Sequence, residues 1–476
     1  MLTIKLNLGS GNDYREGYLN VDKYADTADI NYDLEQLPWP WETNSVTEVI
    51  LRHVLEHLGQ QTELFLNLIK ELHRVCAPNA LVIIDVPHPL HPDYLGDPTH
   101  CRPITAEALW LFNRAYADWL IAVKAIGTPL ATYLNVDFVM EENTEFRDSG
   151  GRLQASRFTL RVKKPIKLAL MSNGLGDVIM GLGACHALHD SGYRVSVTVM
   201  ERYHDIVKVC PHVYSFSESD RAGEIWTCAW NNLQARHQVD EIVSMCGLNP
   251  DLVDDNSKSV VLNIDSAISS AIYAMFLPTN KIVIATACSS KNRKWPKEKW
   301  QELVNKFRAY GIEVISSGMN TGFWHDEYGS DTLEGVTEAF NLPLLYSIEL
   351  YKQCKLVISS DSAPIHMAGI GEAGILGLFS VMAPEFRLPF RHGEFGWKAF
   401  GITTSCKYSP CYPNMVKDYG FVWSDKANSL MSSGISMADV TDQWCDNPED
   451  HMGCMKHITV DEVYNKAIEM YNREVI

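Results

Sequence analysis

The chain has 476 residues, of which 46% are hydrophobic and 10% aromatic, a composition that predicts about three globular domains with packed cores. Its formal net charge of −18, from 59 acidic and 41 basic residues, argues against nucleic-acid binding unless the fold builds a local basic channel. No apolar run reaches the roughly 18 residues of a membrane span, and Lys5 and Asn7 interrupt the apolar start that a signal peptide needs, so we expect a cytoplasmic protein without a transmembrane segment.

A glycine turn follows the first predicted strand. Residues 5–8, Lys-Leu-Asn-Leu, predict a strand that breaks into Gly9-Ser10-Gly11, and residues 18–22 predict a second strand that ends in Asp22. Glycines let the backbone approach a ligand closely, and an acid at the end of this strand can accept hydrogen bonds from a ribose. The segment predicts a site for a nucleoside-containing cofactor.

Residues 1–163 resemble the class I S-adenosylmethionine-dependent methyltransferases, in particular the group with Leu-Asn-Leu-Gly-Ser/Cys-Gly-Asn near the N-terminus. The other matching segments are residues 37–40, 44–46, 53–58 (His-Val-Leu-Glu-His-Leu), 71–75, 81–86, 97–102 (Asp-Pro-Thr-His-Cys-Arg) and 104–105. The resemblance implies that Gly9, Gly11 and Asp22 contact S-adenosylmethionine and that Asp33 reaches its adenine. Two departures make the fold a safer inference than the activity: Asn7 stands where many methyltransferases have an acid, and residues 77–80 replace the usual Pro-Gly-Gly turn.

Three histidines belong to these matching segments. The resemblance implies that His53, His57 and His100 line the acceptor side of the site, and the alternative is that each is a polar core or surface residue. A His-x-x-x-His pair around Glu56 is similar to a metal-binding helix, but the metalloprotease order is His-Glu-x-x-His. The order therefore excludes a zinc protease of that type.

A second strand-to-turn segment begins after a short linker at residues 161–165. The apolar strand 167–171 runs into residues 172–177, Ser-Asn-Gly-Leu-Gly-Asp. The glycines allow close backbone approach, and Asp177 is presented at the carboxyl end of a strand, where α/β sheets bind ligands. The alternative for Asp177 is an N-cap of the following helix.

Two further strands end in polar turns. Residues 282–287 lead into Ser289 and Ser290 and then into a basic run with Lys294, and residues 356–358 lead into Ser359-Ser360-Asp361-Ser362-Ala363-Pro364. The first turn of a helix carries unpaired N–H groups that can hold a diphosphate, and proline suits its first position. The alternatives are ordinary N-capping at 359–364 and a solvated cation at Lys294.

The segment from about residue 165 to 476 resembles glycosyltransferase family 9, the heptosyltransferase-like enzymes. The matching motifs are Gly176-Asp177, Lys294-Trp295-Pro296 with Trp300, and Asp-Ser-x-Pro-x-His-x-Ala at 361–368. The resemblance implies that Asp177 is the general base and that the remaining site residues hold the nucleotide sugar. These are Ser289, Ser290, Lys294, Asp361, Ser362, Ala363 and His366.

The chemistry of an inverting sugar transfer fits these residue types. A carboxylate such as Asp177 takes the proton from an acceptor hydroxyl while the nucleoside diphosphate leaves from the opposite face of the sugar. No Asp-x-Asp metal clamp is evident, so Lys294, hydroxyls and a helix N-terminus are expected to neutralise the leaving diphosphate. The sequence thus predicts transfer that needs no metal ion.

The last quarter of the chain gathers Cys406, Cys411, Cys445 and Cys454. Four thiols could bind zinc, but the usual Cys-x-x-Cys pairs are absent, and unligated thiols are the alternative. We interpret residues 412–440 as an insertion loop near the active cleft. With no export signal, the 12 cysteines of the chain are expected to be thiols and not disulfides.

The whole sequence therefore predicts an α/β protein in which a Rossmann-like methyltransferase domain (1–163) precedes the two Rossmann-like lobes of a GT-B glycosyltransferase. The acceptor lobe is expected at 165–275 and the donor lobe at 280–476. The expected acceptor is a glycan or glycolipid, glycosylated by the second part and O-methylated by the first. One alternative is a phage-type glycosyltransferase that acts on hydroxymethylated DNA bases, and another is an N-terminal domain that serves only as a binding or scaffold module.

Overall fold

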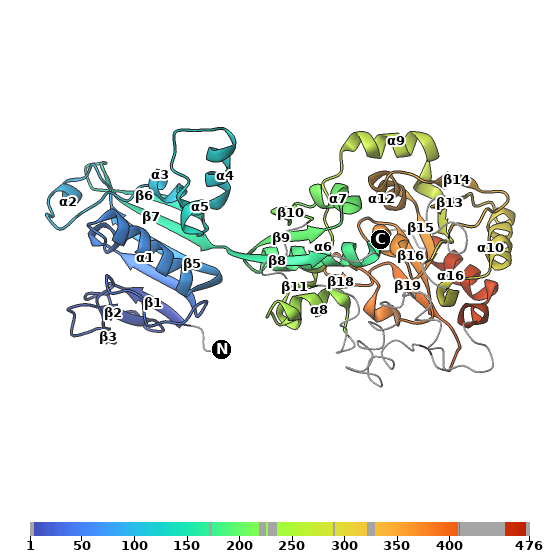
Figure 1. Ribbon diagram of the computed structural model, residues 1–476, viewed down its shortest axis with the longest axis horizontal. Helices are drawn as coiled ribbons and strands as arrows, with labels where there is room; N and C mark the ends of the chain where they lie inside the picture. Colours follow the sequence, from blue (N-terminus) through green and yellow to red (C-terminus); the bar gives the residue numbers. More distant parts are fainter. Residues whose placement is uncertain are drawn as a thin grey trace. The chain divides into compact units, whose positions relative to one another are not determined.

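The computed structural model describes residues 4–170, 174–218, 225–226, 236–288, 291–320, 329–407, 409 and 453–472. The chain divides into two compact units, residues 1–166 with 191–194 (unit 1) and residues 167–190 with 195–476 (unit 2). Figure 1 draws unit 1 in blue to cyan and most of unit 2 in green to red. The three predicted domain ranges are finer than this division and stay predictions.

Unit 1 is built on one seven-stranded sheet with the strand order β3-β2-β1-β4-β5-β7-β6. The first five strands are parallel, while β7 pairs antiparallel with both β5 and β6. The strands are β1 (Ile4–Leu8), β2 (Leu19–Asp22), β3 (Ile30–Asn31), β4 (Val46–Arg52), β5 (Cys76–Pro87), β6 (Phe138–Arg147) and β7 (Leu153–Val162). A parallel sheet that starts at its centre and winds outward in both directions is the Rossmann-like arrangement, so the predicted α/β fold is confirmed.

The helices of unit 1 are mostly short. They are η1 (Leu55–His57), α1 (Thr62–Val75), α2 (Pro92–Leu95), α3 (Ala106–Trp110), α4 (Arg114–Ala122) and α5 (Leu130–Leu134). The longest, α1, buries one apolar stripe against the sheet, with Phe65, Leu68 and Leu72 almost inaccessible to solvent. The predicted turn at 77–80 lies within β5, where it bulges out of register with β4 because Asn79 has a left-handed backbone.

Unit 2 contains two parallel sheets. The smaller has the order β10-β9-β8-β11, and its strands are β8 (Lys164–Leu170), β9 (Tyr193–Val199), β10 (Ser215–Ser217) and β11 (Ile225–Trp226). The first residues of β8 and β9 belong to unit 1. The helical segments between residues 175 and 280 are α6 (Leu175–Asp190), η2 (Glu201–Tyr203), α7 (His204–Lys208), α8 (Gln238–Met245), η4 (Pro250–Leu252), η5 (Asp255–Lys258), α9 (Ser266–Phe276) and η6 (Pro278–Asn280).

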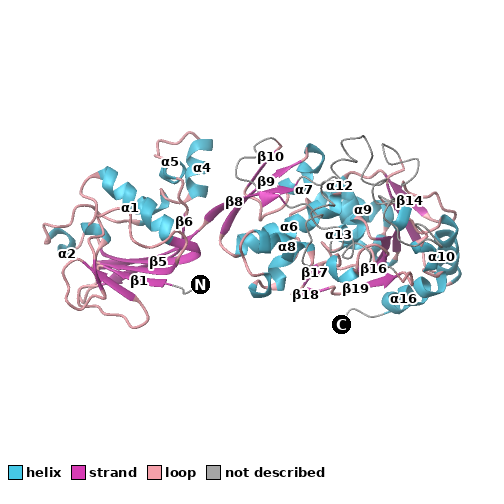
Figure 2. Cartoon of the chain, turned by 60° about the horizontal axis from the view of Figure 1, so that its bottom comes forward, coloured by secondary structure: helices cyan, strands magenta, loops and turns pink. Residues whose placement is uncertain are grey.

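The larger sheet of unit 2 has six parallel strands in the order β14-β13-β12-β15-β16-β19. They are β12 (Ile282–Ala285), β13 (Val314–Gly318), β14 (Thr337–Phe340), β15 (Leu356–Ser360), β16 (Gly374–Phe379) and β19 (Ala399–Thr403). Around it lie η7 (Lys291–Arg293), α10 (Lys297–Ala309), α12 (Leu344–Gln353), α13 (Ala363–Ala368), η8 (Pro384–Phe386), the hairpin β17 (Phe390–Arg391) and β18 (Glu394–Phe395), η9 (Cys454–His457) and α16 (Val460–Asn472). Figure 2 distinguishes these helices from the strands.

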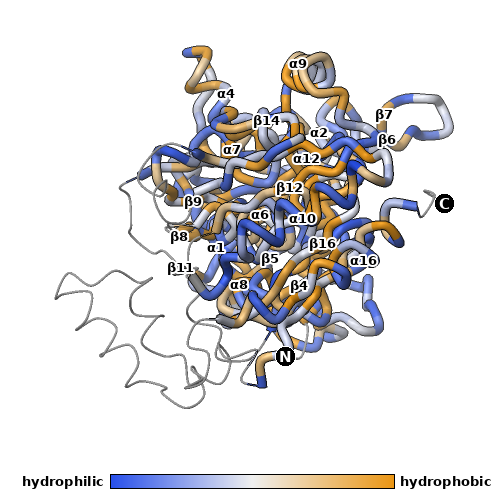
Figure 3. The backbone as a smooth tube through the Cα atoms, turned by 90° about the vertical axis from the view of Figure 1, so that its right-hand side faces the viewer, coloured by the Kyte–Doolittle hydropathy of each residue, from blue (hydrophilic) through white to orange (hydrophobic). Residues whose placement is uncertain are grey.

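The strands of the larger sheet are continuous apolar runs in the sequence because they are buried in a hydrophobic core. β12 and β16 are strongly hydrophobic in Figure 3, and Ile282, Ile284 and Leu376 are fully buried, as expected for parallel strands covered on both faces. Trp295 and Trp300 are also fully buried, with ring centroids 4.8 Å apart. The Trp-Pro part of the Lys-Trp-Pro motif therefore anchors α10 in the core.

Among the described residues, none of the helices combines the length and the hydropathy that crossing a bilayer requires. α6 is the most apolar long helix near the candidate site, but it is buried inside unit 2, where Val178, Leu182 and Leu188 are inaccessible to solvent. Its hydrophobic residues therefore belong to a protein core.

Candidate active sites

The larger sheet of unit 2 reverses its winding direction between β12 and β15. In a doubly wound sheet, the chain leaves the carboxyl ends of two such strands toward opposite faces of the sheet. The crevice between the two connections is where folds of this kind bind ligands. Asp361 and Ser362 directly follow β15, and Ala363 and Pro364 open α13, with Ser362 as its N-cap. The predicted donor-site residues 361–363 thus lie at the reversal point.

Asp361 and Ser362 are held by neighbours across the reversal point. Asp361 is 3% exposed, and Arg293 donates from Nη1 to its backbone oxygen at 2.8 Å while lying 3.7 Å from its Oδ2. The hydroxyl of Ser362 lies 3.1 Å from that of Ser359 and 3.3 Å from the carbonyl oxygen of Ala287, which follows β12. The turn at residues 361–362 is therefore hydrogen-bonded to segments at the ends of both β12 and β15, and the guanidinium of Arg293 lies beside it.

Lys294 stands next to this turn, at the end of η7. Its Nζ donates to the carbonyl oxygen of Gly329 at 2.8 Å and lies 3.2 Å from Oδ2 of Asp331. Asp331 is positioned by its own backbone N–H, which donates to Thr286 just beyond β12. Lys294 is thus a positioned cation and not a fully solvated one. Ser289 and Ser290 lie outside the described residues, and their predicted role stays a prediction.

Asp177 lies in the first turn of α6, two residues inside the helix and not at its N-cap position. Its Oδ1 is 3.2 Å from Nη1 of Arg387, which follows η8, and the same Nη1 donates to Oε1 of Gln238 at 2.6 Å. The two side chains of the ion pair are 20% and 14% exposed, so a partly buried contact links α6 of the smaller sheet to the loop after β16 of the larger one.

Gly176 brings α6 against α13. A Cβ on Gly176 would lie 2.6 Å from Cδ2 of His366, closer than side-chain atoms approach one another. The first turn of α6 therefore reaches His366 only because residue 176 has no side chain. The Gly-Asp motif and the Asp-Ser motif, about 190 residues apart in the sequence, meet at this point.

His366 is buried among charges from both motifs. Its burial, with the positive charge of Arg387 as the next cause, lowers the pKa of His366 to about 4, and Asp361 and Asp177 act in the opposite direction. The imidazole is consequently neutral near pH 7. A neutral ring in contact with Gly176 can position the start of α6 without adding charge to the crevice.

Two cations of this site were not among the sequence-predicted residues. Arg293 lies inside the basic run that contains Lys294, so its neighbours in the sequence offered a signal. Arg387 lies in Pro384-Glu385-Phe386-Arg387, where no motif distinguishes it. Only the packing of the loop after β16 on α6 brings Arg387 to Asp177.

In unit 1 the sheet reverses its winding direction between β1 and β4, and the predicted cofactor residues follow β1 and β2. Gly9 and Gly11 have left-handed backbones, with φ of 66° and 49°. A Cβ on Gly9 would lie 2.3 Å from Cγ2 of Val54, whereas a Cβ on Gly11 would have no atom within 4 Å. Gly9 is therefore required by packing, and Gly11 faces open space.

Asp22 accepts hydrogen bonds from the turn itself. Its Oδ2 accepts from the N–H of Gly11 at 2.8 Å, and its Oδ1 accepts from Tyr24 and Ala25. Burial alone would raise the pKa of Asp22, but these three backbone donors outweigh it and lower the pKa. Through its hydrogen bond with Gly11, Asp22 at the end of β2 is held against the glycine turn that follows β1.

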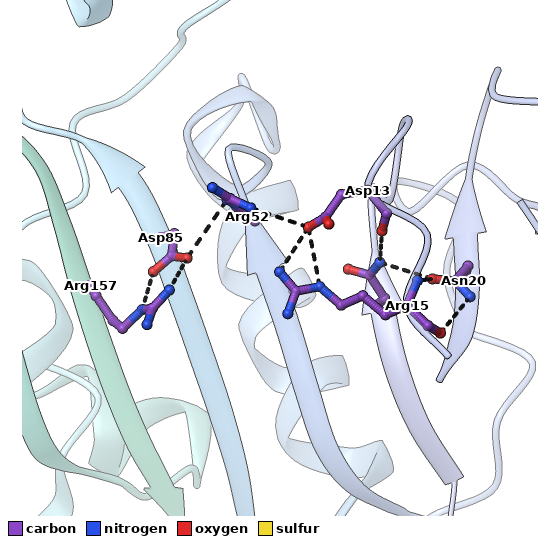
Figure 4. Close-up of polar contacts among 7 residues, drawn as sticks. Asp13, Arg15, Asn20, Arg52, Asp85 and Arg157 are labelled. Carbon is purple, nitrogen blue, oxygen red and sulfur yellow. Dashed lines mark hydrogen bonds and ion pairs between the residues drawn. The ribbon is translucent and has the colours of Figure 1, made fainter. Parts of the chain in front are cut away.

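Figure 4 shows the polar contacts beside this turn. The amide of Asn7, on β1, donates to the backbone oxygen of Asp13 and to Oδ1 of Asn20, so it braces the turn where many methyltransferases have an acid. Asp13 pairs with Arg15 and Arg52, and Arg157 holds Asp85 through two hydrogen bonds of 2.7 and 2.8 Å. The carboxyl edge of the sheet is lined by these charges.

The remaining predicted residues of unit 1 occupy the same edge. Asp33 follows β3, and its Oδ2 lies 2.8 Å from Nζ of Lys23. His53 and His57 flank Glu56 in the turn after β4, and His100 approaches Glu56 from the loop after α2, with 4.0 Å between Nε2 and Oε1. The structure thus brings the three histidines together around one carboxylate.

Of the four C-terminal cysteines, Cys406 and Cys454 lie within the described residues, where Cys454 is buried and Cys406 is partly buried. Cys411, Cys445 and the predicted loop 412–440 lie outside the described residues. A zinc site at these cysteines stays a prediction.

Residues 207–395 match the family model described as "Glycosyltransferase family 9 (heptosyltransferase)". The chain therefore carries a glycosyltransferase family 9 domain and is a glycosyltransferase. The matched range contains Lys294, Asp361, His366 and Arg387 and begins after Asp177. No curated protein matches the chain.

Solved structures similar to this chain include family 9 glycosyltransferases. One from Veillonella parvula is 14% identical over 65% of this chain and 97% of its own, with a TM-score of 0.45. The iron-containing dodecameric glycosyltransferase TibC from enterotoxigenic E. coli is 13% identical over 66% of this chain and 81% of its own, with a TM-score of 0.48. An S-adenosylmethionine-dependent methyltransferase from Archaeoglobus fulgidus is 14% identical over 33% of this chain and 86% of its own, with a TM-score of 0.24.

Proposed function

We propose that unit 2 transfers a sugar, with inversion, from a nucleoside-diphosphate sugar to a hydroxyl of a glycan or glycolipid acceptor. The observation that carries the proposal is the meeting of Asp177 and Arg387 beside His366, where the first turn of α6 contacts α13 and the loop after β16. A carboxylate and a phosphate-binding turn are the two groups that this chemistry requires on opposite sides of the reacting carbon. The family 9 match of residues 207–395 supports the reaction class.

Asp177 is the general base of the proposed mechanism. Its carboxylate, oriented by Arg387, accepts the proton of the acceptor hydroxyl as the oxygen attacks the anomeric carbon. The bond between this carbon and the diphosphate oxygen breaks at the same time, and the diphosphate carries away the electron pair. Transfer from the face opposite the leaving group inverts the configuration at that carbon.

Arg293 and Lys294 receive the developing charge of the leaving diphosphate. Both cations lie at the reversal point between β12 and β15, and fixed cations stabilise a leaving anion without reorganising during the reaction. α13 has only six residues, so its dipole stabilises the leaving diphosphate less than the sequence alone predicts for a helix N-terminus. The side-chain cations therefore supply more of this stabilisation. We propose on this basis that transfer needs no metal ion.

A transfer assay with nucleotide sugars tests the proposal. We expect turnover, with an inverted anomeric centre by NMR, that persists after treatment with EDTA. Loss of activity in EDTA and recovery with Mg²⁺ or Mn²⁺ would contradict metal independence. Loss without recovery calls for a check that the fold is intact, since metal could also support the cysteine-rich region.

For unit 1 we propose S-adenosylmethionine binding by Gly9, Gly11, Asp22 and Asp33, and O-methylation of the same class of glycan acceptor. The open space at Gly11 supports this, because a cofactor can approach the backbone there. Calorimetry with S-adenosylmethionine and S-adenosylhomocysteine tests it. If neither ligand binds at about millimolar concentration, unit 1 is not a methyltransferase and serves only as an acceptor-binding or scaffold module.

The DNA-modifying alternative requires exposed cations beside Asp177. The cation that contacts Asp177 among the described residues is Arg387, which is partly buried and engaged by two acceptors. This observation favours the glycan acceptor over nucleic acid.

A further inference from the structure

Glu56 is a buried carboxylate whose two oxygens lack hydrogen-bond partners. It lies in η1, directly after the carboxyl end of β4, and is inaccessible to solvent. An ionised carboxylate in this environment is unfavourable unless a cation or a donor compensates it. Two imidazole nitrogens lie within ion-pair distance of Oε1 of Glu56, Nδ1 of His53 at 3.6 Å and Nε2 of His100 at 4.0 Å, and both are beyond hydrogen-bond distance.

We propose that Glu56, His57 and His100 form a binding site for a divalent transition-metal ion such as Zn²⁺ or Fe²⁺. One carboxylate oxygen and one nitrogen from each ring lie within 4.8 Å of one another. Ligand atoms on a tetrahedral zinc ion stand about 3.3 Å apart, so small side-chain rotations suffice to close the site. Two imidazoles and one carboxylate favour Zn²⁺ or Fe²⁺ over Mg²⁺ and Ca²⁺, which prefer oxygen ligands.

The hydrogen bonds around the two rings prepare them as ligands. Nδ1 of His100 lies 2.7 Å from the carbonyl oxygen of Tyr94, which can only accept, so Nδ1 carries the proton. The hydroxyl of Thr99 donates to Asp97 at 2.6 Å and therefore accepts from Nδ1 of His57 at 2.9 Å. In the neutral form, each ring therefore has its lone pair on Nε2, and each has the outer partner that orients a metal-bound histidine.

The backbone holds the two segments of the site together. The N–H of Cys101 donates to the backbone oxygen of Glu56 at 2.9 Å, and Arg102 donates to that of Gly59 at 2.7 Å. The loop containing His100 is consequently docked on η1. His57 and His100 are partly exposed, so an ion can reach the cluster from solvent.

The site lies at the same reversal point as the proposed cofactor turn. Val54, two residues before Glu56, contacts Gly9. A metal ion with open positions at this place would polarise an acceptor oxygen, and that use rests on the proposed methyl transfer. The binding of the ion rests on the ligands alone, so a metal-binding test and a methylation test fail independently.

Metal binding to the full chain is the experiment. The protein is stripped with a chelator, dialysed, and titrated with Zn²⁺ and Co²⁺ against a competing dye. Because the 12 cysteines and the cluster His186, Asp190 and His212 can also bind these ions, the readout is the difference in stoichiometry between variants. We expect the wild type to bind one ion more than Glu56→Gln and His100→Gln, and His88→Gln to bind as many ions as the wild type.

Stability separates a metal site from a structural contact. Glu56→Gln replaces a buried carboxyl group whose two oxygens lack hydrogen-bond partners, so the metal-free variant should unfold at the same temperature as the wild type or higher, while the Zn²⁺-induced rise in unfolding temperature is lost. Thr99→Val should weaken Zn²⁺ binding about 10- to 100-fold by releasing His57. Equal stoichiometry in wild type, Glu56→Gln and His57→Gln overturns the proposal.

Discussion

Nη1 of Arg387 lies 3.2 Å from Oδ1 of Asp177, although the two residues are more than 200 positions apart in the sequence. The contact joins the first turn of α6 to the loop after β16, so it forms only when both sheets of unit 2 are folded and packed. The proposed base is thereby oriented by the part of the chain that holds the donor-site residues. The first two predictions test this relationship.

Replacing Asp177 with Asn should lower kcat by about 10²- to 10⁴-fold, because the amide cannot accept the proton of the acceptor hydroxyl. The dissociation constant of the nucleotide sugar should stay unchanged, since Asp177 lies on the acceptor side. Steady-state kinetics and calorimetry measure the two quantities. Asp205→Asn, at an exposed acid of α7 that pairs with Lys208, is the matched control. A variant with wild-type turnover would remove Asp177 from the mechanism.

Replacing Arg387 with Gln should lower kcat by up to about 100-fold through misplacement of the Asp177 carboxylate. The same change in an Asp177→Asn background should have little further effect, because two residues that act as a unit are not additive. Kinetics of the two single variants and the double variant form the cycle. Equal losses in both backgrounds would show that Arg387 acts separately from Asp177, for instance on the phosphates.

Replacing Lys294 with Ala should weaken nucleoside-diphosphate binding by about 1.5–3 kcal/mol, the range for a charge-assisted hydrogen bond, or roughly 10- to 150-fold. Calorimetry with the free nucleoside diphosphate measures the change. Lys297→Ala is the control, since Lys297 is exposed at the start of α10. Unchanged affinity in Lys294→Ala would leave this lysine as a structural partner of Asp331.

Replacing Gly11 with Val should abolish S-adenosylmethionine binding, because the added side chain enters open space at the proposed cofactor turn. Gly17→Val is the matched control: Gly17 also has a left-handed backbone, with φ of 81°, and open space around it. Both variants carry the backbone strain, so a selective loss of binding in Gly11→Val identifies the site. Sugar transfer should persist in both. Equal binding by both variants would mean that the site is misplaced.

The stability of unit 2 should fall as the pH drops below about 6.5. Burial lowers the pKa of His366 to about 4 and that of His237 to about 3, from an ordinary value of 6.5. Between these values the unfolded chain binds protons that the native state does not, so each histidine reduces the free energy of unfolding by up to about 1.4 kcal/mol per pH unit.

Urea denaturation followed by tryptophan fluorescence from near pH 7 to near pH 5 measures this slope. His237→Asn, which keeps a polar side chain at the N-cap of α8, should reduce it. A flat stability profile in the wild type would contradict the buried, neutral state of both rings.

The sequence by itself determined the strands that lead into the candidate sites, the glycine turns and the residue types at the strand ends. Apolar runs bounded by Gly9, Gly176 or Asp361 are local patterns that can be recognised without the fold. A parallel strand that ends in small or acidic residues indicates a candidate ligand site in any α/β sheet. Asp177, Lys294 and Gly11 were predicted in this way, because each follows its strand by fewer than ten residues.

Tertiary structure alone decided which residues meet across long separations. Arg387 has no neighbouring motif and becomes part of the site because the loop after β16 packs on α6. Trp295, part of a site motif, proved to be a core residue because α10 packs there. Glu56 lacks any local sign of its burial, and only the docking of the loop with His100 on η1 removes it from water and surrounds it with imidazoles. Such relationships depend on which surfaces the folded chain presses together, and a periodic pattern in sequence does not contain that information.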